Sequence, residues 1–174
     1  MVKLEGEKTV LKTLERKHCK KLWKDYEINE ELPTQPLEPG KSIENADDWF
    51  EEMQEKQGDD QYYLGIFTYE DELIGDIQLA NIDWKNRTAT LGMCISKKED
   101  RGKGYGTDAC ETIIRFAFDH LDLYRLSART IEFNTAAKKM LEKNGFELEG
   151  KEKKATFRFG ERHDRLIFGL LKDV

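Results

Sequence analysis

Apolar and polar residues alternate with a period of two through the middle of the chain, which is typical of β-strands. The clearest example is residues 88–95, where every second residue from Ala89 to Ile95 is apolar. Residues 62–69 and 72–83 have a similar strand-like composition, and short polar turns separate the three segments. The pattern predicts an antiparallel meander of three strands.

Helical spacing, with apolar residues three or four positions apart, occurs on both sides of this meander. The four predicted helices cover residues 18–30, 45–57, 107–120 and 134–144. In the last of these, Asn134 is the expected N-cap and Gly145 follows the C-terminus. Three further strands are predicted at residues 123–131, 146–159 and 162–171. The whole pattern indicates an α+β fold, with helices packed on a mixed, mostly antiparallel sheet of about seven strands.

Length and charge narrow the class of protein. The 174 residues, 38% of them hydrophobic, suit a single domain covering residues 1–174. Lys and Arg total 29 against 35 Asp and Glu, a net charge of -6, which argues against nucleic acid and favours basic or cationic partners. The cysteines are three in number and form no C-x-x-C pair, which favours a reducing compartment. We find no signal peptide and no run of about 20 apolar residues, so we expect a cytoplasmic protein without a membrane segment.

The run Arg101-Gly102-Lys103-Gly104-Tyr105-Gly106-Thr107 separates a predicted strand from a predicted helix. Glycines allow the backbone to approach an anion closely, and the helix start adds N–H groups and its positive dipole end. A Walker A loop is excluded, because the residue after Lys103 is a glycine. A dinucleotide fingerprint is disfavoured, because an antiparallel meander precedes the run. An ordinary glycine turn with solvated charges is the remaining alternative.

The pattern R-x-x-G-x-G, formed by Arg101, Gly104 and Gly106, resembles the acyl-coenzyme A loop of the GNAT superfamily of N-acetyltransferases. The order of elements that follow, with Asn134 opening a helix that ends before Gly145-Phe146, resembles that family as well. The run at residues 145–150, together with Gly160 and His163-Asp164, is similar to the RimJ/RimL-like branch, which acetylates protein N-termini.

The resemblance implies a binding site for the cosubstrate acetyl-coenzyme A, without a metal. It assigns the strand backbone to the thioester and pantetheine, the glycine run to the pyrophosphate, and one asparagine to the pantetheine arm. These residues are Met93, Cys94, Ile95, Arg101, Gly102, Lys103, Gly104, Tyr105, Gly106, Thr107 and Asn134. For Asn134, a role as helix cap alone is an equal alternative.

Glu149 is the candidate general base, because it matches the glutamate of an L-E-G stretch in the RimL-like pattern. The alternative is an ordinary exposed strand glutamate. Two positions depart from the family pattern: Leu141 stands where many members have a tyrosine general acid, and Ala137 stands where some have a serine. The resemblance therefore leaves the general acid unassigned.

These observations predict an enzyme that transfers acetyl directly to a primary amine, with a protein or peptide N-terminus as the expected acceptor. An α-amine, with a pKa near 8, demands less of a base than a lysine or polyamine. Two alternatives stay open: an acetyltransferase for a polyamine or other small amine, and an acyl-coenzyme A sensor that has lost catalysis. A homodimer is compatible with the resemblance and with the long closing strands.

Overall fold

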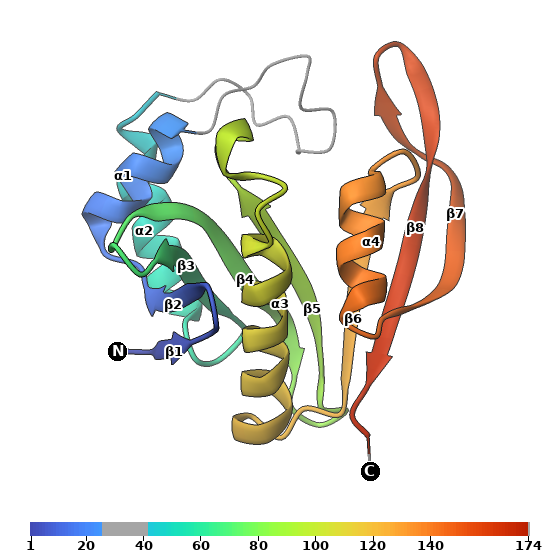
Figure 1. Ribbon diagram of the computed structural model, residues 1–174, viewed down its shortest axis with the longest axis horizontal. Coiled ribbons are helices and arrows are strands. Elements are labelled where there is room, and N and C mark those ends of the chain that lie inside the picture. The colour runs from blue at the N-terminus through green and yellow to red at the C-terminus, as the bar shows by residue number, and fades with distance from the viewer. Residues whose placement is uncertain (26–41, 174) are drawn as a thin grey trace.

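The described part of the chain, residues 1–25 and 42–173, folds around one eight-stranded sheet in this computed structural model (Figure 1). The strand order is β1-β2-β3-β4-β5-β6-β8-β7. The strands are β1 (Lys3–Glu5), β2 (Thr9–Thr13), β3 (Tyr62–Thr68), β4 (Leu73–Asp83), β5 (Thr88–Ile95), β6 (Arg125–Ile131), β7 (Glu147–Arg158) and β8 (Glu161–Leu171). The α-helices are α1 (Arg16–Asp25), α2 (Asn45–Lys56), α3 (Tyr105–Arg115) and α4 (Thr135–Lys143).

The predicted α+β class is confirmed, and the differences concern the ends of elements. β1 and β2 were not predicted, because β1 has only three residues and neither strand has a long alternating pattern. Helix α3 begins at Tyr105, two residues before the predicted start, and a π-helical turn, Phe116–His120, continues it. Residues 26–30 of the first predicted helix lie outside the described residues.

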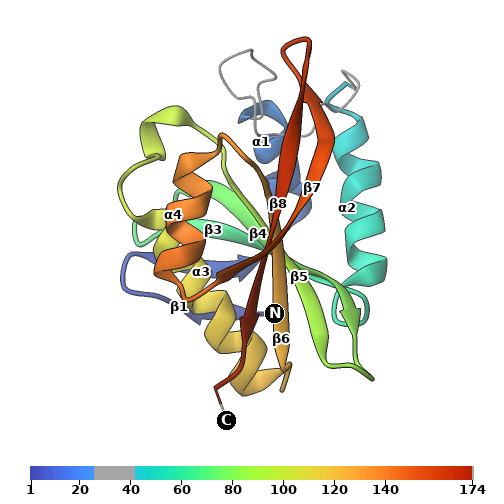
Figure 2. The ribbon, with the colours of Figure 1, turned by 90° about the vertical axis from the view of Figure 1, so that its right-hand side faces the viewer.

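Helices cover both faces of the sheet. Figure 2 shows α3 and α4 on one face and α2 on the opposite face. Under α3 and α4 lies the larger core cluster, which includes the buried residues Ile77, Leu79, Ile113, Leu126, Ala128 and Leu141. A smaller cluster lies under α1 and α2 and includes Leu14, Cys19, Leu22, Met53, Phe67 and Leu73. None of the described helices could cross a membrane, since none is long and apolar enough.

A buried carboxylate fixes the N-terminal turn to the start of α3. Asp108 accepts hydrogen bonds from the backbone N–H groups of Glu7 at 2.8 Å, Lys8 at 3.1 Å and Thr9 at 2.8 Å. The Thr9 hydroxyl donates to the same carboxylate at 2.6 Å. Charge-assisted hydrogen bonds of this kind are stronger than neutral ones, so the β1–β2 turn and the first turn of α3 are held as one unit.

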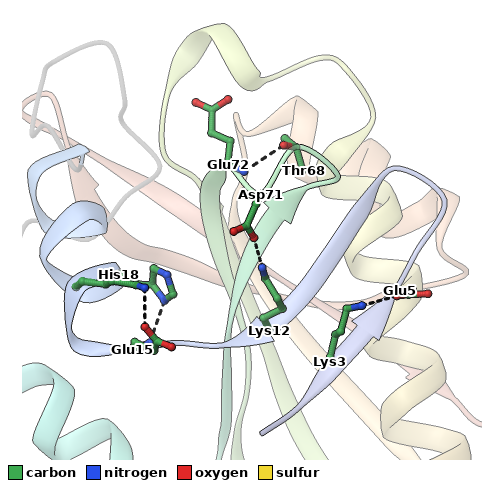
Figure 3. Close-up of polar contacts among 9 residues, drawn as sticks. Lys3, Glu5, Lys12, Glu15, His18, Thr68, Asp71 and Glu72 are labelled. Atoms are coloured by element: carbon green, nitrogen blue, oxygen red, sulfur yellow. Dashed lines mark hydrogen bonds and ion pairs between the residues drawn. The ribbon is translucent and has the colours of Figure 1, made fainter.

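Polar contacts hold β2 and α1 to their neighbours (Figure 3). Lys12 of β2 forms an ion pair with Asp71 in the turn between β3 and β4. At the start of α1 the backbone N–H of Glu15 donates to Nδ1 of His18 at 3.0 Å. These contacts fix the direction in which α1 leaves the sheet.

Strands β5 and β6 pair in parallel for only four residues, from Thr88↔Arg125 to Leu91↔Ala128. Beyond these pairs the two strands separate, and the rest of each strand borders a gap in the sheet. All other neighbouring strands are antiparallel. Beside the gap, β7 and β8 form a long hairpin that projects past α4 (Figure 1). The site described next lies at this gap.

Candidate active site

The glycine run forms the loop that leads into α3. Gly102 and Gly104 have positive φ angles of 74° and 88°, and Gly104 is the N-cap residue of the helix. A Cβ atom on Gly106 would lie 3.3 Å from Cε of Met93, so this glycine lets the start of α3 approach β5 closely. Free N–H groups at a helix start, combined with the helix dipole, form a ready site for an anion. The loop therefore fits the pyrophosphate of coenzyme A.

The two basic side chains of this loop have partners within the protein. Nε and Nη2 of Arg101 donate to the carbonyl oxygen of Ile95 at 3.1 and 2.7 Å. The Arg101 guanidinium thus fixes the end of β5. Nζ of Lys103 lies 3.6 Å from Oδ1 of Asp100, and the Lys103 carbonyl accepts a hydrogen bond from Nζ of Lys8 at 3.1 Å. Backbone N–H groups are the loop's main contribution to anion binding.

The edge of β5 that borders the gap exposes backbone groups. Peptide groups in an antiparallel strand point alternately to its two neighbours. Because the N–H of Ser96 donates to the carbonyl of Ile74 on β4 at 2.9 Å, the N–H of Cys94 also points to β4. The N–H groups of Met93 and Ile95 then point into the gap between β5 and β6. One N–H donor on this open edge is suited to binding the oxygen of a thioester carbonyl, and the other, about 7 Å along the strand, is suited to a second acceptor.

A cleft of about 1510 Å³ passes through this gap. It exceeds the range of roughly 300–1,000 Å³ that is usual for a single small ligand. Of the predicted coenzyme residues, ten line the cleft: Met93, Cys94, Ile95, Arg101, Gly102, Gly104, Tyr105, Gly106, Thr107 and Asn134. The remaining one, Lys103, does not line it. The structure thus brings the predicted group together around one space large enough for two substrates.

Glu149, the predicted general base, does not line the cleft. It lies on β7, and its carboxylate forms a two-point ion pair with Arg125, one contact of which is 2.9 Å. The hydrogen bonds and charge of Arg125 lower the pKa of Glu149, whereas a general base for an amine needs a raised pKa. The expectation for Glu149 is therefore corrected: this placement gives it a structural ion pair. The sequence pattern located the residue but not its partner.

Asp76, which sequence analysis did not select, lies in the cleft instead. It is on β4, directly across from Cys94 on β5. Its Oδ1 accepts a hydrogen bond from the Tyr63 hydroxyl at 2.9 Å. Burial raises the pKa of Asp76 to about 6, and the Tyr63 hydrogen bond opposes that rise. The same burial and the nearby Asp76 charge raise the pKa of Tyr63, so this tyrosine stays a hydrogen-bond donor.

Aromatic rings from α1 and α2 line the cleft beside this pair. Trp49 of α2 contacts Tyr63 edge to face, with ring centroids 5.6 Å apart, and Trp23 of α1 lies 6.1 Å from Trp49. Asp48 and Glu52 of α2 line the same part of the cleft. Aromatic faces and carboxylates together attract cations, so this half of the cleft is suited to an ammonium group.

The remaining predicted positions lie along α4. Oδ1 of Asn134 accepts a hydrogen bond from the backbone N–H of Ala137 at 3.1 Å, so Asn134 caps α4 while also lining the cleft. The cap prediction is confirmed, and binding of the pantetheine arm stays a prediction. Leu141 is 3% exposed and borders both the cleft and the larger core cluster. A side chain of this type cannot donate a proton.

Asp76 could have been found from its sequence context. It is the only charged residue between Leu73 and Leu79, in a stretch whose other residues are apolar, glycine or glutamine. A carboxylate in the interior of such a strand must be desolvated on one face of a sheet, which marks candidate functional groups. The partner Tyr63 lies on another strand, and only the β3–β4 register reveals that they meet.

Residues 9–147 match the GNAT acetyltransferase domain family, and the chain belongs to this family. YdaF of Bacillus subtilis, whose name describes a ribosomal N-acetyltransferase, is 38% identical over 104 residues. That match covers 60% of this chain and 56% of YdaF, so the chain spans little more than half the length of this relative. The family and the named relatives are acetyltransferases, which agrees with the predicted enzyme class.

Solved structures confirm the fold. RimL, described as a ribosomal L7/L12 alpha-N-protein acetyltransferase in complex with coenzyme A, aligns with a TM-score of 0.87 at 18% identity, covering 98% of each chain. Spermidine N-acetyltransferase from Vibrio cholerae, in complex with CoA and spermine, aligns with a TM-score of 0.83 at 21% identity. That alignment covers 94% of this chain and 95% of the other. Both alignments agree with the fold predicted from the sequence.

Proposed function

We propose that this protein acetylates the α-amine of a protein or peptide N-terminus, with Asp76 as the general base. One observation carries the proposal: a carboxylate of raised pKa lies on the aromatic side of the cleft, one strand away from the open edge of β5. The predicted polyamine acceptor is the alternative.

The pKa of Asp76 favours an α-amine over a polyamine. An α-ammonium has a pKa of about 8 and a lysine-type ammonium a pKa of about 10.4. With a base of pKa about 6, proton transfer is uphill by about 2 units for the first and about 4 units for the second. At 1.36 kcal/mol per unit, this is about 3 against about 6 kcal/mol. The α-amine is therefore the acceptor that Asp76 can deprotonate at a modest cost.

The other residues of the cleft support this role. One of the two N–H groups, that of Met93 or that of Ile95, donates to the thioester carbonyl oxygen, where negative charge develops during acetyl transfer. The glycine loop and the start of α3 bind the pyrophosphate of the donor. Trp49 and Tyr63 form the wall against which the acceptor lies. Asp76 takes the ammonium proton directly or through one water.

Acceptor class is tested by the release of free thiol from acetyl-coenzyme A. The panel holds N-terminal peptides, peptides blocked at the N-terminus that contain one lysine, and spermidine. We expect kcat/KM to be highest for free N-terminal peptides. A higher value for spermidine would refute the N-terminal acceptor and place Asp48 and Glu52 in a polyamine site. Absence of turnover with any amine would refute the assignment of this cleft as an N-acetyltransferase site.

Asp76→Asn tests the base, with Asp83→Asn at the far end of the same strand as control. We expect kcat for the peptide to fall by about 10²–10³-fold in the first variant, because general base catalysis contributes about 10²–10⁴-fold. The KM for acetyl-coenzyme A should not change. Asp83 lies outside the cleft, where its carboxylate binds Asn86, so its variant should keep near wild-type turnover.

Stability provides the folding control for Asp76→Asn. The folded pKa of about 6 exceeds the unfolded value of about 3.9, so wild-type stability falls as pH rises from about 4 to about 6. Asparagine does not ionise and avoids this loss. The variant should therefore unfold at pH 8 no earlier than wild type on heating, which separates lost catalysis from lost folding.

A homodimer and a cytoplasmic location stay proposals. β7 is the outer strand of the sheet, and one of its edges is unpaired within the described part of the chain. Such an edge is a surface on which a second copy can pair. No disulfide joins Cys19, Cys94 and Cys110 in the described part of the chain, which is compatible with a reducing compartment. Sedimentation equilibrium measures the oligomeric state directly.

A further inference from the structure

Three arginines lie on one face of the sheet beside the gap. Arg125 and Arg129 are four residues apart on β6, and Arg165 of β8 lies directly across from Ile131 of β6. Side chains two or four residues apart in a strand share a face, as do directly paired residues. The intervening residues Leu126 and Ala128 belong to the core under α3 and α4. The arginines therefore face away from α3 and α4.

Two of these arginines are neutralised by glutamates of β7. Arg125 binds Glu149, and Nε of Arg165 binds Glu152. Arg129 is exposed, and none of the described residues forms a hydrogen bond or ion pair with its guanidinium. The Arg129 charge contributes to lowering the pKa of Glu152, but the ion-pair partner of that carboxylate is Arg165. Arg129 is also the member of the three that lines the cleft.

Arg129 lies on the acceptor side of the cleft. Its face is opposite the face covered by α3, whose start forms the pyrophosphate loop. Asp76 also faces away from the α3 side, since its neighbour Ile77 points into the core there. Continuing the register Leu91↔Ala128 places Arg129 level with Gly92, two strands across from β4. Strands lie about 4.8 Å apart, Asp76 is two residues along from the level of Gly92, and β5 and β6 diverge beyond Ala128, so the backbones at Asp76 and Arg129 are about 12 Å apart or more.

We infer that Arg129 is a specificity-determining residue that binds a carboxylate of the acceptor. The inference rests on the proposed N-terminal acceptor, whose amine lies at Asp76. An extended peptide advances about 3.4 Å per residue. With the reach of both side chains, a carboxylate on the second or third residue of the acceptor meets the guanidinium. The acceptor class is therefore an N-terminal peptide with Asp or Glu close behind its first residue.

The same charge disfavours polyamines. A guanidinium that has no ion-pair partner among the described residues, on the same face of the sheet as the base, repels the second ammonium of an extended polycation. Guanidinium and carboxylate instead match in geometry and form charge-assisted hydrogen bonds. Arg129 thus favours an acidic N-terminal peptide over a polyamine, whereas Asp48 and Glu52 of α2 attract the ammonium group of either acceptor.

The experiment compares two acceptors of equal size that differ only in charge, Ser-Asp-Asp-Ala amide and Ser-Asn-Asn-Ala amide. In wild type we expect about tenfold higher kcat/KM for the Asp peptide, expressed mainly in KM. In Arg129→Met this preference should vanish, because kcat/KM for the Asp peptide falls to the value for the Asn peptide, while the KM for acetyl-coenzyme A stays unchanged. Arg129→Lys keeps the charge and should retain part of the preference. A purely structural role for Arg129 would lower turnover of both peptides alike.

Arg162→Met is the matched control. Arg162 is an exposed arginine of the β7–β8 hairpin whose guanidinium lies over the Phe157 ring, 5.9 Å from its centroid, and it does not line the cleft. This variant should keep the wild-type preference. Equal kcat/KM for the two peptides in wild type would overturn the inference, and so would a preference that survives in Arg129→Met.

A binding measurement separates this inference from the proposed function. Coenzyme A joined covalently through an acetyl bridge to the N-terminus of each peptide occupies both halves of the cleft without turnover. We expect the Asp conjugate to bind wild type about tenfold more tightly than the Asn conjugate, and both to bind Arg129→Met equally. If neither peptide is turned over but the Asp conjugate keeps this advantage, the proposed function fails and the anion site stands. Equal affinities in wild type refute the anion site whatever the turnover.

Discussion

Replacing Tyr63 by phenylalanine removes one hydroxyl from the cleft and tests the origin of the Asp76 pKa. Two opposing effects set that pKa to about 6: burial raises it, and the hydrogen bond from Tyr63 at 2.9 Å lowers it. Phenylalanine keeps the ring beside Trp49 but donates no hydrogen bond. The carboxylate of Asp76 then keeps the cost of burial and loses its stabilising donor, so its pKa must rise.

The size of the shift follows from the strength of the lost bond. A hydrogen bond to a charged group contributes about 1.5–3 kcal/mol, and one pKa unit corresponds to 1.36 kcal/mol, so a rise of about one unit is a conservative value. The pKa would then be near 7. At pH 6 the ionised fraction of Asp76 falls from about one half to about one tenth, a fivefold loss. At pH 8.5 the carboxylate is ionised in both proteins.

The assay is kcat/KM for an N-terminal peptide between pH 5.5 and 9. The ratio of kcat/KM in wild type to kcat/KM in Tyr63→Phe should fall from about five at pH 6 to a constant value above pH 8, where Asp76 is ionised in both proteins. Ionisation of the peptide amine affects both proteins equally and cancels in this ratio. Tyr62→Phe is the control, because Tyr62 is the preceding residue, does not line the cleft and packs on Phe116 with ring centroids 5.2 Å apart. A ratio independent of pH would refute the role of Asp76 as the titrating base.

Two further predictions concern the donor side of the cleft. Gly104→Ala forces a side chain into the left-handed region at the N-cap of α3, which costs about 1–2 kcal/mol, and should weaken coenzyme A binding about tenfold by calorimetry. Gly160→Ala carries a similar strain, with φ 75°, in the β7–β8 turn and should leave that affinity unchanged; equal losses in both variants would contradict a local effect. Asp108→Asn weakens four hydrogen bonds to the N-terminal turn and should cost about 2–3 kcal/mol, a fall in Tm of about 5–10 °C. The control is Asp119→Asn, at an exposed position on the π-helical turn, which should change Tm by less than 2 °C. If Tm fell equally in both variants, the loss of stability would come from removing a charge and not from the hydrogen bonds of Asp108.

Much of the fold could be predicted because its long elements repeat regularly. The strands β3, β4 and β5 of the meander have seven or more residues each, and β5 alternates clearly between apolar and polar positions. β1 and β2 have three and five residues, and much of their stability comes from Asp108, which is about one hundred positions away. A contact at that separation leaves no periodic signal in either segment.

The donor half of the candidate site could be predicted, and the acceptor half could not. The donor half depends on the backbone conformation of a continuous glycine run, which a sequence displays directly. The acceptor half depends on pairs from different strands, Tyr63 with Asp76 and Arg125 with Glu149. Nothing in the sequence indicated that Glu149 pairs with Arg125, and this partner determines the electrostatics of the carboxylate. A glutamate that acts as a general base and a glutamate held in an ion pair are the same letter in a sequence. Only their contacts with other strands distinguish them.

The two walls of the cleft differ in what they are made of, and this has a consequence for how such an enzyme can change. In the proposed function, the donor wall at Met93 and Ile95 acts through main-chain N–H groups, which no substitution other than proline removes. The acceptor wall acts through the side chains of Trp49, Asp76 and Arg129. Mutation can therefore alter which amine is accepted while the acetyl-handling chemistry persists. A scaffold arranged in this way can diversify in substrate range without reinventing its reaction.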